Sequence, residues 1–538
     1  MQSLNLLPVL AALAVGASAG SANNNLTCSS SFFSSIIPSN ATLNYVNHVP
    51  QNGSFGDRWA NENATALPEG CAVSVNVPSS NVTGYNIALF LPTSWNTRFM
   101  ATGSGGYGGY TSWSEMSRLA QYGFAVISTD TGHSSGEPDG RWAYHHPEMV
   151  IDWAWRALHG SVVIGKDLTA SYYDQPAEYS YYSGCSTGGR QGLKEIQAFP
   201  EDFDGALIGA PAWDISVLAP FVAWFGAQNS PLNSSHHLSY DLVSALRSEI
   251  VRQCDPQDGL TDGIIMDPRA CDFRLEAMLC KSSSNSSSCL TPAQMETARR
   301  LISPWVDVNA TYVFPTFPLG ADLHIASFDN PSATGTQWGS LGTDWIQYWV
   351  LNQSESIDWV NLNYYDVTEL SASINPGDAV AGVDISKFQQ RGGKIIHYHG
   401  YADEFIPTDH SRNYYDHVNQ VFAQSGVDLD DFYRFFQIPG MAHCYSSDTA
   451  PWYIAGSLQN LDDNSFGVPG YDDRHHNSIL ALLAWTEKNE APDYLIPTKY
   501  NNDTASQGVE IQRPVCPYPK KARYTGGDVK SPDSWKCA

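Results

Sequence analysis

Short apolar runs and helical repeats alternate in two separate parts of the chain. Apolar runs closed by Pro, Gly or Asp predict buried strands at residues 85–91, 98–102, 124–128, 178–183, 204–209, 393–400 and 432–438. Helical spacing predicts helices at residues 114–121, between residue 184 and Pro200, and near residues 478–488. Strands that alternate with helices in this way are typical of a parallel sheet covered on both faces. We therefore expect an α/β fold.

The alternation is lost between residues 210 and 388, where the composition also changes. Aromatic residues become frequent there, namely Trp213, Trp224, Phe225, Trp305, Phe314, Trp338, Trp345, Trp349, Trp359 and Tyr364. A chain of 538 residues is long enough for a large domain with an insertion, or for two to three domains. The simplest organisation is one α/β domain from residues 20–209 and 389–538, interrupted by a lid domain at residues 210–388 over the carboxyl ends of the strands.

The first residues predict that the protein is secreted. An apolar stretch from Leu4 to Val15 precedes Ala17-Ser18-Ala19, the pattern of a signal-peptidase site, so we expect residues 1–19 to be a signal peptide. The stretch is too short to span a bilayer, and no other stretch is long and apolar enough. Secretion fits the ten Asn-x-Ser/Thr sequons for glycosylation, at Asn25, Asn40, Asn52, Asn63, Asn81, Asn233, Asn285, Asn309, Asn352 and Asn502.

The balance of charge argues against two classes of partner. The formal net charge is −26. A surface that binds nucleic acid or an anionic membrane needs clustered Lys and Arg, and the sequence has no such cluster. We therefore expect neither nucleic acid nor a membrane as a partner.

The stretch from Gly184 to Gly188 carries the strongest chemical signal. Gly184-x-Ser186-x-Gly188 lies between a predicted strand and a predicted helix, which is the context of a nucleophile elbow. Glycines are needed there because neighbouring side chains would collide with the strand and the helix. An ordinary turn is the alternative. The strand-turn-helix context favours Ser186 as the nucleophile of an α/β-hydrolase fold.

Two later residues complete a candidate catalytic triad. In this fold an acid and then a histidine follow the serine along the chain. Asp403 comes after the strand at residues 393–400 and His443 after the strand at 432–438, where the loops of a parallel sheet converge. Asp403 would orient His443, which would take the proton of Ser186 and return it to the leaving alcohol. Taken singly, an aspartate in a turn and a core histidine explain these two residues better.

Ten cysteines, an even number in a chain expected to be secreted, predict five disulfides. Sequence alone does not fix their pairing. Closeness along the chain and tethering of the amino-terminal segment favour Cys254 with Cys271, Cys280 with Cys289, Cys516 with Cys537, and Cys28 with Cys71. The two that remain, Cys185 and Cys444, adjoin the candidate nucleophile and base, so a disulfide between them would hold these two groups in register. Two free thiols are the alternative.

The glycine-rich run after the strand at residues 98–102 supplies candidate donors for an oxyanion hole. Such a site needs one backbone N–H from the residue after the nucleophile and one from a loop after an earlier strand. Thr187 is the first predicted donor. We favour Gly106 as the second, with Gly105 as the next candidate. The run also resembles a phosphate-binding loop, but it lacks the Gly-Lys-Ser/Thr ending.

The segment at residues 254–265 has the donors of a calcium site. Carboxylates of Asp255, Asp258 and Asp262 with carbonyl groups of Leu260 and Ile264 would form an oxygen cage. A solvated acidic turn is the alternative. We expect a structural calcium ion in the lid and no organic cofactor.

Other histidines have weaker claims to chemistry. His397 and His399 share one face of a predicted strand, but no nearby set of carboxylates or cysteines completes a metal site. We expect both, and His133, to be core residues.

The stretches GCSTGGR (184–190), HGYAD (399–403) and HC (443–444) closely resemble the fungal tannase and feruloyl esterase family, which is known for a Cys-Ser, Asp, His-Cys arrangement. The resemblance spans nearly all of the mature chain, and residues 254–265 are similar to the family's calcium site in the lid. CSTGGRQG (185–192) and DFYRFF (431–436) are more similar to the feruloyl esterases than to the tannases. One departure is GSGG at residues 103–106, where related esterases tend to carry Asn after the first glycine.

This resemblance implies a secreted serine esterase that cleaves esters of plant hydroxycinnamic acids through an acyl-enzyme. Its substrate would be a small or polysaccharide-linked phenolic ester. A lid aromatic such as Trp224 or Trp349 is a candidate to stack on the phenolic ring, although packing within the lid explains these two tryptophans equally well. The alternatives are a tannase acting on gallate esters, an esterase for another aromatic ester, a peptidase, and a secreted binding protein without turnover. The triad, the cysteine pair and the oxyanion glycines together argue against the last.

Overall fold

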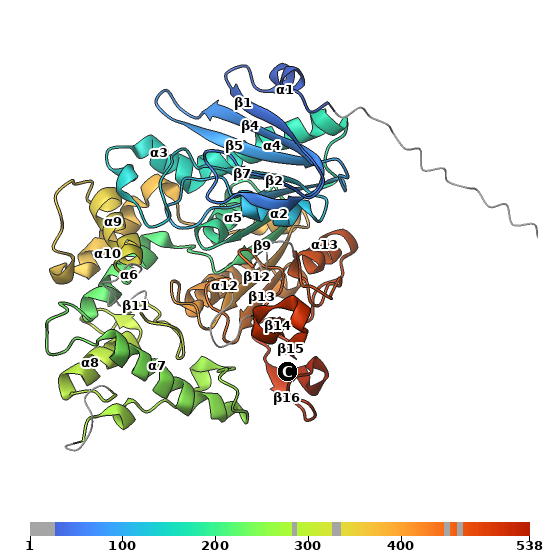
Figure 1. Ribbon diagram of the computed structural model, residues 1–538. Coiled ribbons are helices and arrows are strands. Elements are labelled where there is room, and N and C mark those ends of the chain that lie inside the picture. Colours follow the sequence, from blue (N-terminus) through green and yellow to red (C-terminus); the bar gives the residue numbers. More distant parts are fainter. Residues whose placement is uncertain (1–26, 282–287, 325–334, 446–451, 460–465) are drawn as a thin grey trace, which may run out of the picture.

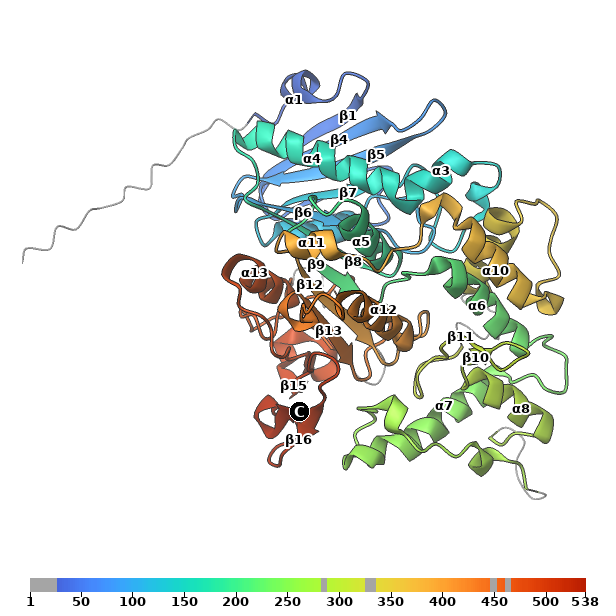
Figure 2. The ribbon, with the colours of Figure 1, turned by 180° about the vertical axis from the view of Figure 1, so that it is seen from behind.

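The computed structural model describes residues 27–281, 288–324, 335–445, 452–459 and 466–538. The predicted signal peptide and the sequons at Asn25 and Asn285 lie outside these residues. Within them a nine-stranded sheet carries helices on both faces (Figures 1 and 2). In order across the sheet, the strands are β1 (Thr42–Val49), β4 (Gly70–Pro78), β5 (Gly84–Pro92), β7 (Ala125–Thr129), β6 (Arg98–Thr102), β8 (Tyr179–Cys185), β9 (Gly205–Gly209), β12 (Lys394–Gly400) and β13 (Tyr433–Ile438).

The sheet is mixed, so the prediction of a parallel sheet holds for one part of it and is corrected at the other edge. From β7 across to β13 the neighbouring strands are parallel, whereas β1, β4, β5 and β7 pair antiparallel at the other edge. Only residues 79–83 connect β4 to β5. So short a connection allows a hairpin and excludes the crossover that parallel pairing needs.

Alternate residues of each strand pack against opposite helical layers. In β5, Ile87 and Leu89 belong to one buried cluster, and Ala88 and Phe90 to another. The first cluster is covered by α1 (Ser30–Ile36), α4 (Ala157–Tyr173), α5 (Thr187–Ala198), α11 (Ser386–Gln390) and α12 (Thr408–Phe422). The second is covered by α2 (Trp113–Ala120) and α13 (Ser478–Lys488). Because both faces are buried, these strands read as continuous apolar runs in the sequence.

Between β9 and β12 the chain forms a mainly helical layer beside the sheet, drawn green to yellow in Figures 1 and 2. Its elements are α6 (Ile215–Gln228), α7 (Tyr240–Cys254), α8 (Pro292–Leu301), β10 (Trp305–Val306), β11 (Tyr312–Phe314), α9 (Gly335–Asp344) and α10 (Tyr364–Ile374). This layer shares one hydrophobic cluster with Val150 of α3 (Pro147–Ile151) and with Trp153. It is therefore packed firmly against the α/β part.

Small hairpins and disulfides complete the described structure. The hairpins pair β2 (Gly53–Phe55) with β3 (Ala64–Leu67), β14 (Thr498–Tyr500) with β15 (Val509–Gln512), and β16 (Ala522–Tyr524) with β17 (Trp535–Cys537). The disulfides join Cys28 to Cys71, Cys185 to Cys444, Cys254 to Cys271, Cys280 to Cys289, and Cys516 to Cys537. Across the described ranges, none of the helices has the length and apolar character needed to cross a membrane.

Candidate active site

Ser186 occupies the sharp turn between β8 and α5. Its backbone has φ 62° and ψ −124°, a conformation that residues with a side chain rarely adopt. A Cβ at Gly184 would come within 2.8 Å of the Gly188 backbone, and one at Gly188 within 3.2 Å of the Ser104 carbonyl oxygen. Close packing therefore requires both glycines of the motif. The serine side chain is left accessible at the carboxyl end of β8.

Asp403 and His443 follow the carboxyl ends of β12 and β13. Nδ1 of His443 lies 2.7 Å from Oδ2 of Asp403. Asp403 is fully buried, and its Oδ1 accepts hydrogen bonds from the backbone N–H groups of Phe405 and Ile406, each at 2.8 Å. The carboxylate is thus held in one orientation. It places the proton of the neutral imidazole on Nδ1 and leaves the lone pair on Nε2.

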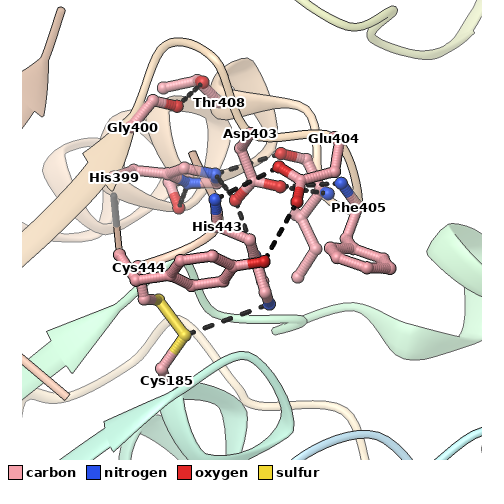
Figure 3. A network of polar contacts seen from close by, with 12 residues as sticks. Cys185, His399, Gly400, Asp403, Glu404, Phe405, Thr408, His443 and Cys444 are labelled. Atoms are coloured by element: carbon pink, nitrogen blue, oxygen red, sulfur yellow. Dashed lines mark hydrogen bonds and ion pairs between the residues drawn. A yellow bond between two sulfur atoms is a disulfide. The ribbon is translucent and has the colours of Figure 1, made fainter. Parts of the chain in front are cut away.

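The free nitrogen of His443 faces the nucleophile turn. Nε2 lies 3.9 Å from Sγ of Cys185, and Ser186 and His443 line the same cavity. The contacts of the described residues include no direct hydrogen bond between Ser186 and His443. Such bonds are often long without substrate and tighten when it binds. A disulfide joins Cys185 to Cys444, with Cα atoms 6.3 Å apart, and so connects the loops that carry the two groups (Figure 3).

The backbone groups predicted to form an oxyanion hole lie beside Ser186. Thr187 is the first residue of α5, so its N–H has no partner within the helix. Gly105 and Gly106 line the same cavity from the loop after β6. The Gly105 N–H donates to the Tyr110 hydroxyl at 3.0 Å, whereas the Gly106 N–H, at φ 47°, has no acceptor among the described residues. Gly106 and Thr187 thus remain the candidate donors for an oxyanion hole.

A cavity of about 400 Å³ opens over these residues. One apolar wall comes from α6, through Ile215, Leu218, Ala219 and Val222. The segment between β9 and β12 thus forms part of the cavity, while the α/β part supplies Ser186 and His443. Pockets of this size and character hold small organic ligands.

The two tryptophans considered for ring stacking do not line this cavity. The Trp224 ring stacks on Trp305, with centroids 5.0 Å apart. The Trp349 ring packs on Tyr107 and Trp345, at 5.1 and 4.9 Å. Packing within the molecule therefore accounts for both.

Three carboxylates influence His443. Burial lowers the pKa of its imidazole, but the charge and hydrogen bond of Asp403 and the charges of Glu404 and Glu137 outweigh this, so the pKa lies above its ordinary value. Glu404 accepts hydrogen bonds from the His443 backbone N–H at 3.3 Å and from the Tyr445 hydroxyl at 3.4 Å. Burial and the charge of Asp403 raise the pKa of Glu404 to about 7.

These charges predict where the acid limb of the pH profile lies. If neutral His443 accepts the proton of Ser186, as the sequence predicts, kcat/KM falls as the pH drops through the raised pKa of His443. In Glu137→Gln a negative charge is lost, which lowers the pKa of His443 and moves the acid limb to lower pH. The Gln oxygen still accepts from Tyr110. Initial rates across the acid and neutral range measure the shift, with exposed Glu355→Gln as the control. A limb that does not move in Glu137→Gln contradicts this assignment.

Some residues of the site escaped sequence reasoning because only folding brings them there. Glu137 and Tyr445 carry no motif. Glu404 had one signal, its position next to Asp403. His399 is buried, as expected of a core residue, and its Nε2 also lies 2.9 Å from Oδ2 of Asp403, a contact that the sequence did not predict.

The segment predicted to bind calcium forms an acidic turn after α7. Asp255 is buried, and its carboxylate accepts the backbone N–H of Asp262 at 3.2 Å. The Leu260 N–H donates to Asp258 at 2.9 Å, and the Ile264 N–H donates to Asp262 at 3.1 Å. All five predicted residues therefore belong to one compact turn.

The donor chemistry of this turn fits a hard cation. Burial and the charges of Asp262 and Asp255 raise the pKa of Asp258, as expected where carboxylates crowd together. The three aspartates are not among the groups of potential metal ligands that lie within 4.8 Å of one another in the described residues. Asp262 instead pairs with Arg513 at 2.5 Å.

Comparison with known proteins places the chain in a family. Residues 71–538 match the family model described as tannase and feruloyl esterase. The chain is 36% identical over 509 residues to a probable feruloyl esterase B-2 of Aspergillus oryzae, covering 93% of each protein. It is 37% identical over 473 residues to a probable feruloyl esterase B-1 of Neosartorya fischeri, covering 87% of this chain and 86% of the relative.

Solved structures agree with this match. The crystal structure of feruloyl esterase B from Aspergillus oryzae gives a TM-score of 0.86 at 34% identity, over 95% of this chain and 99% of that one. A tannin acyl hydrolase from Aspergillus niger shares the fold, with a TM-score of 0.74 at 22% identity over 95% of each chain. The predicted α/β-hydrolase fold and family resemblance are thereby confirmed. The chain is a carboxylic ester hydrolase and belongs to the tannase and feruloyl esterase family.

Proposed function

We propose that the protein is a feruloyl esterase, which hydrolyses esters of hydroxycinnamic acids and small or polysaccharide-linked alcohols. The observation that carries the proposal is that Ser186 and His443 line one cavity with an apolar wall, and that buried Asp403 contacts Nδ1 of His443. The likeness to probable feruloyl esterases B over most of the chain supports the acyl group. A phenolic ring suits the apolar wall that α6 provides, and the ester carbonyl suits the part of the cavity lined by Ser186 and His443.

In this mechanism Ser186 Oγ attacks the ester carbonyl as His443 Nε2 takes its proton. The N–H groups of Gly106 and Thr187 stabilise the negative charge that develops on the carbonyl oxygen. His443 then protonates the leaving alcohol, and the acyl group stays on Ser186. A water molecule, deprotonated by His443, releases the hydroxycinnamic acid and restores the serine. Asp403 stabilises the imidazolium formed in each step.

The test is a panel of esters given to the purified protein. We expect kcat/KM for methyl ferulate, caffeate or p-coumarate to exceed that for methyl gallate by about 10-fold or more. The matched ferulic amide should be stable, which separates an esterase from a peptidase. Turnover of gallate alone would identify a tannase, and cleavage of an activated p-nitrophenyl ester alone would refute the proposed substrate.

We also propose that the turn containing Asp255, Asp258 and Asp262 binds calcium, with carbonyl groups of Leu260 and Ile264 as further ligands. The three carboxylates and two carbonyl groups that one turn after α7 carries support this. Chelation is expected to lower Tm by about 5 °C, and calcium, but not magnesium, should restore it. The Asp258→Asn variant should no longer respond to calcium. The same Tm with and without chelator in the wild type would contradict a calcium site.

Secretion with glycosylation completes the proposal. The eight sequon asparagines within the described residues are exposed, at Asn40, Asn52, Asn63, Asn81, Asn233, Asn309, Asn352 and Asn502. Exposure is what an oligosaccharide requires, and the five disulfides fit an oxidising compartment. The mass of the secreted protein before and after enzymatic deglycosylation tests this.

A further inference from the structure

A second histidine meets the triad aspartate. Oδ2 of Asp403 lies 2.7 Å from Nδ1 of His443 and 2.9 Å from Nε2 of His399. Figure 3 shows His399 at Asp403, the residue that also contacts His443. His399 belongs to β12, so its ring is carried by a strand of the central sheet and not by a loop.

Behind His399 the hydrogen bonds continue into the core. Nδ1 of His399 lies 2.7 Å from Oγ of Ser411 on α12, which lies 2.9 Å from Nε2 of His397. Nδ1 of His397 lies 2.7 Å from the Tyr433 hydroxyl at the start of β13. His397, His399, Asp403, Ser411 and Tyr433 are each 0% exposed. Because water is excluded, each of these bonds is stronger than it would be at the surface.

Counting protons fixes the direction of these bonds. Asp403 and the Ile406 carbonyl, 3.0 Å from His399 Nε2, only accept, so that nitrogen carries a proton. If Nδ1 of His399 carried a second proton, every bond behind it would reverse, and the Tyr433 hydroxyl would lack an acceptor among the described residues. The arrangement that uses every proton runs in one direction: from Tyr433 to His397, to Ser411, to His399 and to Asp403.

The charge states of the outer groups agree with this direction. Burial, with smaller contributions from His399 and His410, lowers the pKa of His397 well below its ordinary value, so His397 is neutral and able to accept. Burial raises the pKa of Tyr433 well above its ordinary value, so its hydroxyl keeps its proton and donates.

His399 also completes the set of donors around Asp403. An ionised carboxylate has about four acceptor positions. Phe405 and Ile406 occupy two at Oδ1, and His443 and His399 occupy two at Oδ2. Burial alone would raise the pKa of Asp403, but the charge of His443 and the hydrogen bonds from both histidines lower it below the ordinary value. The aspartate therefore stays ionised although no water reaches it.

We propose that His399 is a positioning residue of the reaction, which holds Asp403 ionised and in the orientation that His443 needs, and that Ser411, His397 and Tyr433 orient His399 from behind. This inference rests on the proposed serine mechanism. The N–H of His399 points its positive end at Asp403, so it keeps the proton of the His443 imidazolium from passing to the aspartate.

Removal of the donor is the direct test. In His399→Leu we expect kcat to fall about 10- to 100-fold with KM little changed. The acid limb of kcat/KM should move to higher pH, because the lost N–H dipole had opposed protonation of His443. His399→Gln, whose amide nitrogen replaces Nε2, should recover kcat to within about 10-fold of wild type and restore the limb. Exposed His145→Leu serves as the control.

The charged and titratable groups that face His399 and His443 belong to several elements. They are Asp403, Glu404 and Tyr445 near the triad, Glu137 from the loop after β7, and His397 and His410 from β12 and α12. All are unchanged in the His399 variants, so a moved acid limb reports the missing donor. If His399 contributed only to packing, its replacement would lower kcat but would leave the acid limb of kcat/KM at the same pH.

Two milder variants keep the proposal testable if His399→Leu does not fold. Ser411→Ala and Tyr433→Phe each delete one hydroxyl from the chain of hydrogen bonds that runs from Tyr433 to Asp403. We expect kcat to fall about 3- to 10-fold in Ser411→Ala and less in Tyr433→Phe. If His399→Leu matches wild type or does not fold, the other two variants decide. Wild-type kcat and a wild-type pH profile in both His399→Gln and Ser411→Ala would then overturn the proposed chain of hydrogen bonds. Equal losses in His399→Leu and His399→Gln, with the limb unmoved, would overturn the positioning of Asp403 by the donor.

A readout without substrate separates this inference from the proposed activity. A fluorophosphonate reacts with an activated serine, forming an O–P bond and releasing fluoride. We expect His399→Leu to slow the labelling of Ser186 about 10- to 100-fold. If the wild type labels rapidly but turns over no hydroxycinnamate, the proposed substrate fails and the positioning role still stands. Equal labelling rates in His399→Leu and wild type refute the positioning role.

Discussion

Replacing Ser186 by Ala is expected to lower kcat/KM for every ester by about 10⁴-fold or more, because the proposed nucleophile, which shares its cavity with His443, is lost. The residual rate would come from water attacking a substrate that is still bound and polarised. Alanine has the same Cβ as serine, so the strained turn at φ 62° is no harder to form and the fold should be unchanged. Initial rates, with a thermal unfolding curve for each protein, measure both effects.

The control for this variant is Ser248→Ala, which removes an exposed hydroxyl from α7, far along the chain from the triad. Intact-mass measurement during turnover of a slow ester should detect the acyl adduct in the wild type and in Ser248→Ala. Turnover by Ser186→Ala within 10-fold of wild type would show that another residue is the nucleophile.

Removal of the disulfide beside the triad is expected to have the second largest effect. Cys185→Ala combined with Cys444→Ala opens a loop of 259 residues, to which the chain-entropy model assigns about 5 to 6 kcal/mol of unfolding free energy. The link also holds the residues next to Ser186 and His443 with Cα atoms 6.3 Å apart. A displacement of about 1 Å between such groups costs about 100-fold in rate, so we expect kcat to fall by about that factor.

The matched control is the pair Cys280→Ala and Cys289→Ala, which opens a separation of nine residues in the segment between β9 and β12. The same model assigns about 3 kcal/mol to so short a loop. Denaturant unfolding gives the stability of each double variant, and kcat under conditions where both are folded gives the catalytic part. Loss of stability with an unchanged kcat in the Cys185 and Cys444 variant would limit the disulfide to a structural role.

Much of the fold could be predicted from local patterns. The sequence predicts a strand at residues 98–102 and a helix near residues 478–488, and β6 and α13 have these bounds. Burial on both faces makes such a strand apolar throughout, and this signal lies within the strand itself. The position of Ser186 was equally local, since a nucleophile elbow needs its glycines within two residues of the serine.

The antiparallel edge of the sheet was not predicted. Only one of the eight residues of β1 is buried, so its apolar residues form no continuous run. The short connection between β4 and β5 indicates a hairpin, but it can be recognised only when the bounds of both strands are known, and the sequence patterns predict no strand at the position of β4.

By itself, the sequence determined which residues are candidates for chemistry. They are a serine between glycines, an acid and a histidine that each follow a strand, and two cysteines, one beside the serine and one beside the histidine. Only the tertiary structure decided what surrounds them. The apolar wall from α6 and the carboxylate of Glu137 are brought to the site by packing between segments far apart in the chain. The contact of His399 with Asp403 joins residues only four apart, but it depends on the turn that the chain makes after β12. The physical reason is that hydrophobic periodicity and turn chemistry act over a few residues, whereas the pKa of His443 depends on every charge that folding brings near it.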